Sequence, residues 1–364
     1  MTAPLPSHPA GRMTPGCACC AAPSRRRFLT ATTAALGAAA LGPATLLPRV
    51  AQAAAASGAF IDFHHHLEPS GKNVEGRPWS LQAAIEELAA NSVIAMGWTG
   101  PVFDADPAAA AKKARQYNEW GAQIRRDHPE RFGQFASLPM MDVDASLAEI
   151  AHAFDVLKVD GIGLATNYGE AWLGERRFQP IFEELNRRKA VVYVHPAQAP
   201  CCTASAFSYQ RENEFLSAPW IEFPTNTART ILSLWASQTT QRLPDIRFVF
   251  SHGGGVMPIL LGRFAGFSGW ETVGPERLKA LFPQGVYAEF GKLYFECAQA
   301  YAPETMAMLR SIVPASHLLF GSDYSYFHVA HSVQRFNALA LPADVQQQIK
   351  NGNAAALLPR RHNG

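Results

Sequence analysis

The stretch Ala59–His66, which reads AFIDFHHH, decides the fold. Its first half is typical of a buried β-strand, and side chains two residues apart along a strand point to the same face. His64 and His66 can therefore bind one ion together, whereas His65 points elsewhere and is expected to be structural. A His-x-His pair at a strand end predicts a metal site if further ligands converge on it.

Three more metal-competent side chains stand at the ends of β-like runs: His195 after 190–194, His252 after 247–251 and Asp323 after 318–322. If the strands are parallel and close into a barrel, their carboxyl ends meet at one mouth, where barrel enzymes hold their catalytic residues. Topology then brings together residues that are far apart in the sequence. The pattern predicts a catalytic metal centre.

The chain alternates strand-like and helical patterns without an obvious linker. The strand-like runs lie near 59–63, 93–97, 132–138, 161–165, 190–194, 246–251, 293–297 and 318–322. The helical patterns lie at 80–91, 107–128, 144–158, 177–189, 225–240, 303–312 and 343–357. Asp144 is expected to cap the third helix. Eight strands with helices between them predict a (β/α)8 barrel. A doubly wound sheet is the alternative, but no Gly-x-Gly-x-x-Gly follows the first strand.

The first 53 residues differ in composition from the rest. Of the 32 basic residues five lie here, with no acidic one, so 27 remain against 30 acidic residues, a net charge of −3. Arg25-Arg26-Arg27 leads into an uncharged stretch that ends at the small residues Ala51-Gln52-Ala53, a pattern typical of twin-arginine export. We therefore expect a cleavable signal peptide over 1–53 and an exported domain over 54–364, in the periplasm or outside the cell.

Composition narrows the class of protein further. An uncleaved anchor over 28–48 is the alternative to the signal peptide, but its prolines and glycines make it a poor span, so we expect no stable membrane span after processing. Hydrophobic content of 48% and charged content of 17% are typical of globular proteins. No basic stripe follows the leader, so a nucleic-acid partner is not expected.

Three cysteines remain outside the leader. Cys201 and Cys202 are adjacent and cannot readily bridge each other, so Cys297 is their only internal partner. In an oxidising compartment a bridge from Cys297 to either one can form. Buried free thiols are the alternative.

Several motifs, many of them at these strand ends, carry a family resemblance: Asp62–Pro69, Phe135–Pro139, Thr166–Gly169, Phe182–Asn186, Val194–Pro196, Ser251–Gly254, Leu319–Tyr324 and Gly352–Ala354. With them the chain resembles the amidohydrolase-2 group of the amidohydrolase superfamily, which includes aminocarboxymuconate-semialdehyde decarboxylase. The resemblance runs from about Phe60 to Leu358. Within the group the chain is most similar to 6-methylsalicylate decarboxylase-like proteins, through Thr166–Gly169 and Glu222–Arg229.

The resemblance implies a metal site and its catalytic neighbours. Four residues would bind one divalent metal: His64, His66, His195 and Asp323. His252 and Asp323 would be the catalytic residues, with His252 as an acid/base beside the metal. Three imidazoles and a carboxylate suit Zn²⁺ best, and Mn²⁺ is the alternative. The resemblance also implies a homodimer.

The substrate is expected to be a small carboxylic acid. Arg229 could clamp its carboxylate, and four more residues lie where an aromatic ring would be flanked: Trp98, Asn167, Tyr168 and Tyr324. The first expectation is non-oxidative decarboxylation of a hydroxylated aromatic or unsaturated acid. The alternative is metal-dependent hydrolysis of a lactone, ester or amide, with Asp323 taking a proton from water. A third possibility is an exported barrel that binds a metal or ligand without catalytic turnover.

Overall fold

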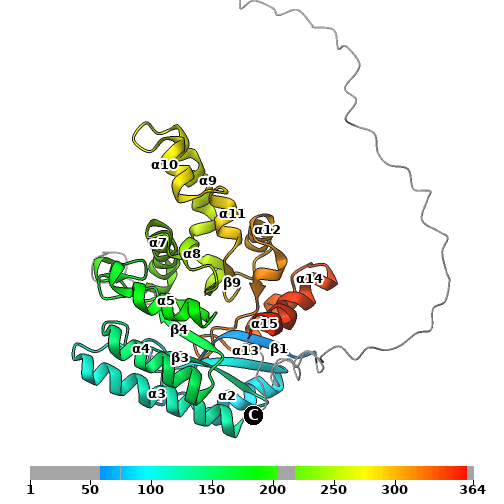
Figure 1. Cartoon of the computed structure of the whole chain (residues 1–364). Coiled ribbons are helices and arrows are strands. Elements are labelled where there is room, and N and C mark those ends of the chain that lie inside the picture. Colours follow the sequence, from blue (N-terminus) through cyan, green and yellow to red (C-terminus); the bar gives the residue numbers. More distant parts are fainter. Residues whose placement is uncertain (1–57, 74, 203–217, 359–364) are drawn as a thin grey trace, which may run out of the picture. The chain divides into compact units, whose positions relative to one another are not determined.

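The computed structural model describes residues 58–73, 75–202 and 218–358. Eight parallel strands form one sheet in the order β1-β2-β3-β4-β7-β8-β9-β10 (Figure 1). They are β1 Phe60–His66, β2 Val93–Trp98, β3 Phe132–Ser137, β4 Gly161–Ala165, β7 Val191–His195, β8 Arg247–Phe250, β9 Tyr294–Glu296 and β10 Leu318–Leu319. The first four strands are buried along their whole length, as expected for parallel strands covered on both faces. The prediction of a (β/α)8 barrel is confirmed.

Residues 62–66 and 320–324, called the seam below, lie together between the first and last strands. Three backbone hydrogen bonds join them: Phe63 N–H to Phe320 O at 2.9 Å, Asp323 N–H to His64 O at 2.8 Å and His66 N–H to Tyr324 O at 2.6 Å. His65 and Tyr324 form a parallel bridge. The seam therefore places the His-x-His pair of β1 beside Asp323.

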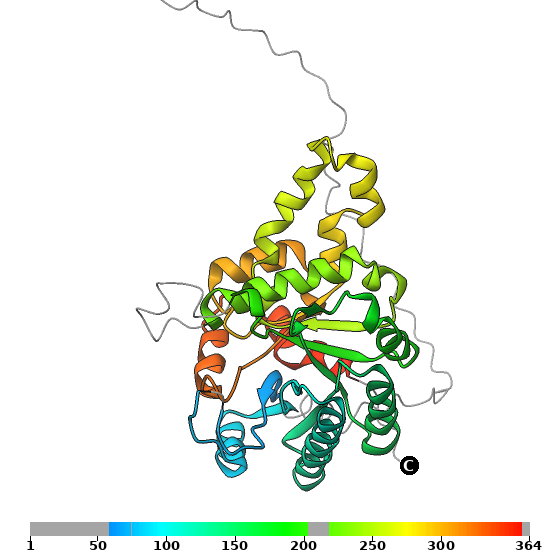
Figure 2. The ribbon, with the colours of Figure 1, turned by 90° about the vertical axis from the view of Figure 1, so that its left-hand side faces the viewer.

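Helices connect the strands and cover the outer face of the sheet (Figures 1 and 2). They are α2 Leu81–Ala90, α3 Pro107–Asp127, α4 Val143–Ala151, α5 Gln179–Arg187, α7 Glu222–Ala236, α8 Thr239–Arg242, α12 Pro303–Ile312, α13 Val329–Asn337, α14 Ala343–Gln347 and α15 Asn353–Leu357. Two predicted helices are interrupted by π-helical turns, at His152–Leu157 and Gln348–Gly352. The hairpin of β5 Asn167–Tyr168 and β6 Ala171–Trp172 follows β4.

The predicted cap of α4 is wrong. Asp142 caps this helix, since its extended backbone lets the carboxylate accept a hydrogen bond from Ala145 N–H at 3.0 Å. Asp144 already lies in the first turn, where its negative charge favours the helix N-terminus but cannot accept this bond.

An excursion between β8 and β9 was not expected from the sequence. It contains α9 Met257–Gly266, α10 Gly274–Leu281 and α11 Val286–Gly291, and α9 and α10 project away from the barrel (Figures 1 and 2). An open cavity of about 490 Å³ is lined by residues of this excursion, among them Leu278, Phe282 and Tyr287. It contains none of the predicted site residues.

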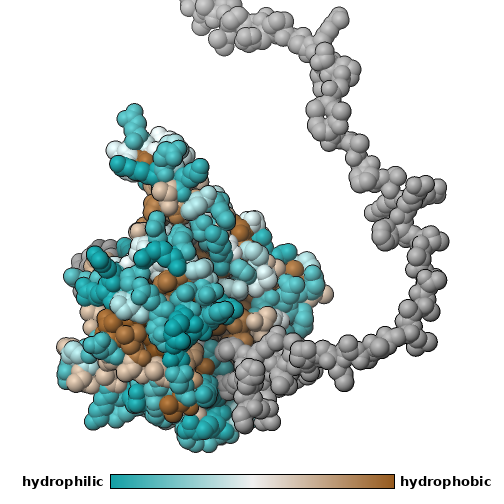
Figure 3. Space-filling model, in the orientation of Figure 1, coloured by the Kyte–Doolittle hydropathy of each residue, from teal (hydrophilic) through white to brown (hydrophobic). Residues whose placement is uncertain are grey.

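Apolar side chains fill the barrel interior and form the floor of its mouth. Phe63, Trp98, Phe135 and Tyr193 are all buried there, and the rings of Phe135 and Tyr193 stack with centroids 5.7 Å apart. The interior of this barrel is a packed hydrophobic core without a channel, so its chemistry is confined to the mouth. Figure 3 shows the side in view mostly hydrophilic, with apolar residues in scattered patches.

Two expectations concern features away from the barrel mouth. Cys297 is a buried free thiol and Cys201 is exposed, so of the two alternatives left open for Cys297 the free thiol is the one found. Among the described residues no helix is long and apolar enough to cross a membrane. The leader and the stretch 28–48 lie outside the described residues.

Candidate metal centre and catalytic site

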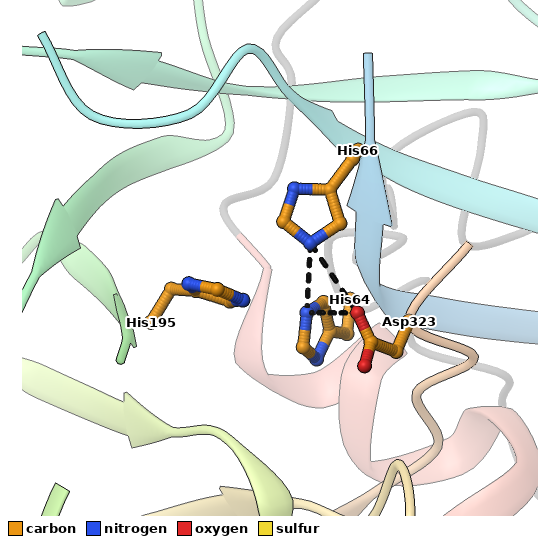
Figure 4. A group of neighbouring side chains, drawn as sticks. All are labelled: His64, His66, His195 and Asp323. Carbon is orange, nitrogen blue, oxygen red and sulfur yellow. Dashed lines mark hydrogen bonds and ion pairs between the residues drawn. The ribbon is translucent and has the colours of Figure 1, made fainter. Parts of the chain in front are cut away.

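Four side chains from distant parts of the sequence meet at the barrel mouth. One ligand atom from each of His64, His66, His195 and Asp323 lies within 4.8 Å of the others. Figure 4 shows the four side chains turned toward one another. His64 Nε2 lies 3.1 Å from His66 Nε2 and 3.1 Å from Asp323 Oδ1. These are the four residues predicted from the sequence to share one ion.

Asp62 organises the seam behind these ligands. Its carboxylate is fully buried and accepts hydrogen bonds from His64 N–H at 3.0 Å, from Ser322 N–H at 2.8 Å and from the Ser322 hydroxyl. It also lies 3.3 Å from His65 Nδ1. Asp62 thus ties β1 to the loop that carries Asp323, whose φ of 62° is in the left-handed region.

Glu296 at the end of β9 is a functional residue that the sequence did not reveal. Its buried carboxylate accepts a hydrogen bond from His64 Nδ1 at 2.8 Å. A carboxylate acceptor requires a proton on Nδ1, so Nε2 is the nitrogen with which His64 faces the other ligands. The only available signal was that Glu296, like the other site residues, stands near a strand end.

His252 lies beside the four converging residues with one ring nitrogen already engaged. Its Nδ1 lies 3.0 Å from Ala298 O, and because a carbonyl only accepts, Nδ1 donates and Nε2 remains for chemistry. The His252 ring centroid is 5.0 Å from that of His64 and 6.2 Å from that of His195. Its φ of 55° is left-handed. Three glycines follow it, and a Cβ at Gly255 would overlap Pro224 O.

The electrostatics of the site fit a divalent cation. Burial, reinforced by His64 and His66, holds the pKa of His195 well below its usual value, so this imidazole keeps a free lone pair. Burial also lowers the pKa of His66, against the pull of Asp323. Burial opposes protonation of His64, but Asp323 and Glu296 outweigh it and raise its pKa to about 10.

Asp323 completes this charge pattern. Burial would raise its pKa, but His64 and His66 outweigh burial and hold the pKa well below the usual range. Neutral imidazoles and an ionised carboxylate are the protonation states that bind a metal. His66, His195 and Asp323 are already in these states, whereas His64, with its raised pKa, is protonated in the metal-free site and must release that proton when the ion binds. With that release, the donor set fits the ion that the sequence predicts.

Of the predicted substrate contacts, Trp98 lies beside this site, and Arg229 stands on a helix that reaches it through Phe223. Trp98 is buried, and its ring centroid is 5.7 Å from that of His195 and 6.3 Å from that of His66. Arg229 lies on α7, half-buried, and donates to Asn226 Oδ1 at 2.7 Å. On the same helix, the Phe223 ring centroid is 6.3 Å from that of His195.

The other three predicted substrate contacts are engaged with the protein. The Asn167 amide donates to Gly169 O at 2.9 Å, and the Tyr168 hydroxyl accepts from Ala165 N–H at 3.2 Å. The Tyr324 ring stacks on His65, with centroids 4.8 Å apart, on the side of β1 away from the ligands. These contacts favour packing roles.

Tyr326 has the place that was expected for Tyr324. It is half-buried, and its ring meets that of His66 edge-on at a centroid distance of 5.1 Å. It stands three residues after Asp323 in the loop that follows β10. In the sequence, only its position in the loop after the last strand could have indicated that Tyr326 lies at the site.

Comparison with known proteins gives a consistent family. A family model described as Amidohydrolase matches residues 61–360. A 6-methylsalicylic acid decarboxylase from Penicillium expansum is 32% identical over 326 residues, covering 82% of this chain and 96% of that protein. Decarboxylase macB from Penicillium terrestre is 32% identical over 330 residues, covering 82% and 95%.

Solved structures share the fold. A dihydroxybenzoic acid decarboxylase from Polaromonas sp. JS666 with bound manganese and 2-nitroresorcinol superposes with a TM-score of 0.70 at 18% identity, covering 82% of this chain and 96% of that one. A 2,6-dihydroxybenzoate decarboxylase from Rhizobium gives a TM-score of 0.72 at 19% identity, covering 82% and 98%. The family model and the relatives at 32% identity show that the chain belongs to the amidohydrolase-2 family, which its strand-end motifs resemble.

Proposed function

We propose that this protein is a metal-dependent, non-oxidative decarboxylase of a small hydroxylated aromatic carboxylic acid. The observation that carries the proposal is the convergence of His64, His66, His195 and Asp323 beside His252, in a chain 32% identical to a 6-methylsalicylic acid decarboxylase. A more distant relative, from Rhodococcus jostii, is a gamma-resorcylate decarboxylase, 24% identical. Both names describe acids with a ring hydroxyl.

The walls of the site suit an aromatic substrate. A bound divalent cation would supply a Lewis acid for the substrate carboxylate and the neighbouring hydroxyl. Phe223 and Tyr326, both half-buried, offer ring surface next to His195 and His66, and the buried ring of Trp98 packs against both imidazoles. Aromatic faces of this kind orient a flat ring and exclude water from it.

Decarboxylation needs one proton at the ring carbon that bears the carboxylate. The proton forms the new C–H bond, the C–C bond breaks, CO2 leaves and the ring regains aromaticity. Asp323 and His252 are the two groups that we assign to this transfer. Asp323 is ionised in the unliganded site, so it must gain its proton as substrate binds, and His252 Nε2 is placed to assist.

Zinc is the metal that we expect. Three imidazole nitrogens and one carboxylate oxygen are the donors that Zn²⁺ prefers, with an open position for substrate. Manganese remains the alternative, and the Polaromonas structure contains it. Metal analysis of the purified protein, followed by reconstitution of the metal-free protein with each ion, distinguishes them.

A substrate screen of the metal-quantified protein tests the proposal. Salicylates, dihydroxybenzoates and lactones are supplied in parallel, and CO2 release and acid release are recorded separately. CO2 release from a hydroxybenzoate is the expected result. Acid release without CO2 would instead make the protein a hydrolase, and bound metal without turnover would make it a binding barrel.

The leader and the assembly state are further proposals. We propose that residues 1–53 direct twin-arginine export, which predicts that replacing Arg25, Arg26 and Arg27 by lysine retains the protein in the cytoplasmic fraction. We also propose a homodimer, as the resemblance implies. Ile259, Trp270 and Tyr287 on the excursion are exposed apolar side chains that a partner could cover. Light scattering of the purified protein measures the assembly state.

A further inference from the structure

Glu296 contacts two residues to which we assign different roles. Its Oε1 accepts from His64 Nδ1 at 2.8 Å and from His252 backbone N–H at 2.9 Å, while Oε2 accepts from Ala298 N–H at 2.7 Å. We propose that Glu296 is a positioning residue that couples the orientation of the metal ligand His64 to that of the acid/base His252.

The coupling follows from how His252 is held at both ends. Its backbone N–H is bonded to Glu296 directly, and its ring Nδ1 is bonded to the carbonyl of Ala298. The N–H of that same Ala298 is bonded to the other carboxylate oxygen of Glu296. A displacement of this carboxylate therefore moves the His252 backbone and ring together, and it releases His64 Nδ1 at the same time.

The backbone of Gly321 lies directly against this carboxylate, where a side chain would collide with it. A Cβ at Gly321 would overlap Glu296 Oε2 and would come within 2.8 Å of its Cδ. Gly321 cannot easily retreat, because its N–H and its carbonyl are both bonded to the Tyr301 hydroxyl at 3.0 Å. Its φ lies outside the left-handed region, so alanine is conformationally allowed there.

Glu296→Gln tests the role against a matched control. Glutamine preserves the length of the side chain but replaces one accepting oxygen by an NH2 donor. That donor then faces another donor, either His64 Nδ1–H or Ala298 N–H, and the hydrogen bond there is lost. The control is Glu149→Gln, because Glu149 is another buried glutamate, bonded to Asn118 and Arg115 away from the site. Both variants remove one buried charge, so a purely structural role for Glu296 predicts the same behaviour in both.

The expected result is a joint loss of metal affinity and turnover in Glu296→Gln. Co²⁺ and Zn²⁺ affinity, measured by chelator competition, should fall about 10- to 100-fold. The visible spectrum of the Co²⁺ protein should change, and kcat of the fully loaded enzyme should fall with little change in KM. Glu149→Gln should lower only the melting temperature. If Glu296→Gln also changes only the melting temperature, the coupling is overturned.

Gly321→Ala provides a second test that leaves Glu296 chemically intact. The added methyl should displace the carboxylate and lower Co²⁺ affinity in the wild-type background, and this loss should largely disappear in Glu296→Ala. An equal loss in both backgrounds would trace the effect to His64 Cβ, 3.1 Å from the added methyl, and would refute the coupling. Only the kcat measurement in these tests rests on the proposed function. Metal affinity and the Co²⁺ spectrum decide it without a substrate, even if decarboxylation fails.

Discussion

The seam side and the β7 side of the site hold their ligands in different ways. On the seam side, His64, His66 and Asp323 lie 3.1 to 3.4 Å apart, with Asp62 and Glu296 bonded behind them. On the β7 side, no residue in the described part of the chain forms a hydrogen bond with the His195 ring. In Figure 4, dashed lines join His64, His66 and Asp323 to one another, and none of them reaches His195.

Among the described residues, ring packing is what orients the His195 side chain. Its ring meets those of His64 and His66 nearly at right angles, at 86° and 89°, with both centroids 4.9 Å away. Trp98 lies 5.7 Å from it on another side. We infer that the seam ligands are set before an ion arrives, whereas His195 completes the coordination. The comparison teaches that ligands of one site can differ in their contribution to the fold.

His64→Ala should have the largest effect. The substitution removes a ligand and leaves Asp323 and Glu296 buried without their shared imidazole partner. Breaking buried ion pairs in this way costs about 3 kcal/mol or more of the free energy of unfolding. Turnover should fall by at least roughly 10³-fold, and elemental analysis should find little metal. A variant that keeps both metal and activity would contradict the ligand assignment.

His195→Ala should separate metal binding from stability. The free energy of metal binding, roughly 10–16 kcal/mol, is divided among four ligands. Loss of one ligand should therefore lower metal affinity by about 10²- to 10³-fold. The free energy of unfolding of the metal-free protein should change by less than about 1 kcal/mol, because no described hydrogen bond to the ring is lost. Denaturant unfolding with and without metal measures both quantities. A destabilisation as large as that of His64→Ala would break the comparison.

His252→Ala should lose activity and keep metal. As an acid/base it contributes about 10²-fold or more to kcat, and it is not one of the four converging ligands. The matched control is His317→Ala, because His317 Nδ1 also donates to a backbone carbonyl beside β9, that of Leu293. Steady-state kinetics on metal-quantified samples should show full activity only for the control. Metal loss in His252→Ala would indicate a ligand role.

Much of this site could be predicted because each residue follows an apolar run, and apolar runs are visible in a sequence. Glu296 was not predicted as a site residue because the expected strand ran through Cys297 and so placed the glutamate in the strand interior. In the structure β9 ends at Glu296. Tyr324 was chosen by position in the loop, but alternation at the seam turns its ring toward His65. The excursion packs through tertiary contacts that no short pattern records.

Arg188→Ala should have the smallest effect and should spare the site. Arg188 ends α5, where it bonds Glu184 at 2.6 Å and Asp155 at 2.7 Å, at the end of the barrel opposite the mouth. The Arg187 hydrogen bond, against some burial and with help from Arg188, lowers the pKa of Glu184 to about 2. The Arg188 hydrogen bond is the largest cause of the lowered pKa of Asp155, so the variant removes that shift and the Arg188 part of the shift at Glu184. A lowered carboxyl pKa stabilises the fold above the unfolded value near 4.5, and this stability is lost as pH falls toward 2.

The variant should therefore lose about 0.5–1 kcal/mol at pH 7, and its difference from the parent protein should shrink below pH 4.5. Urea unfolding at pH 7 and at pH 3 measures this change. Metal affinity and kcat should stay unchanged, because residues at the amino-terminal face of a barrel serve stability and those at its mouth serve chemistry. A loss of metal affinity comparable to that of His195→Ala would mean that this face also holds the β7 side of the site in place.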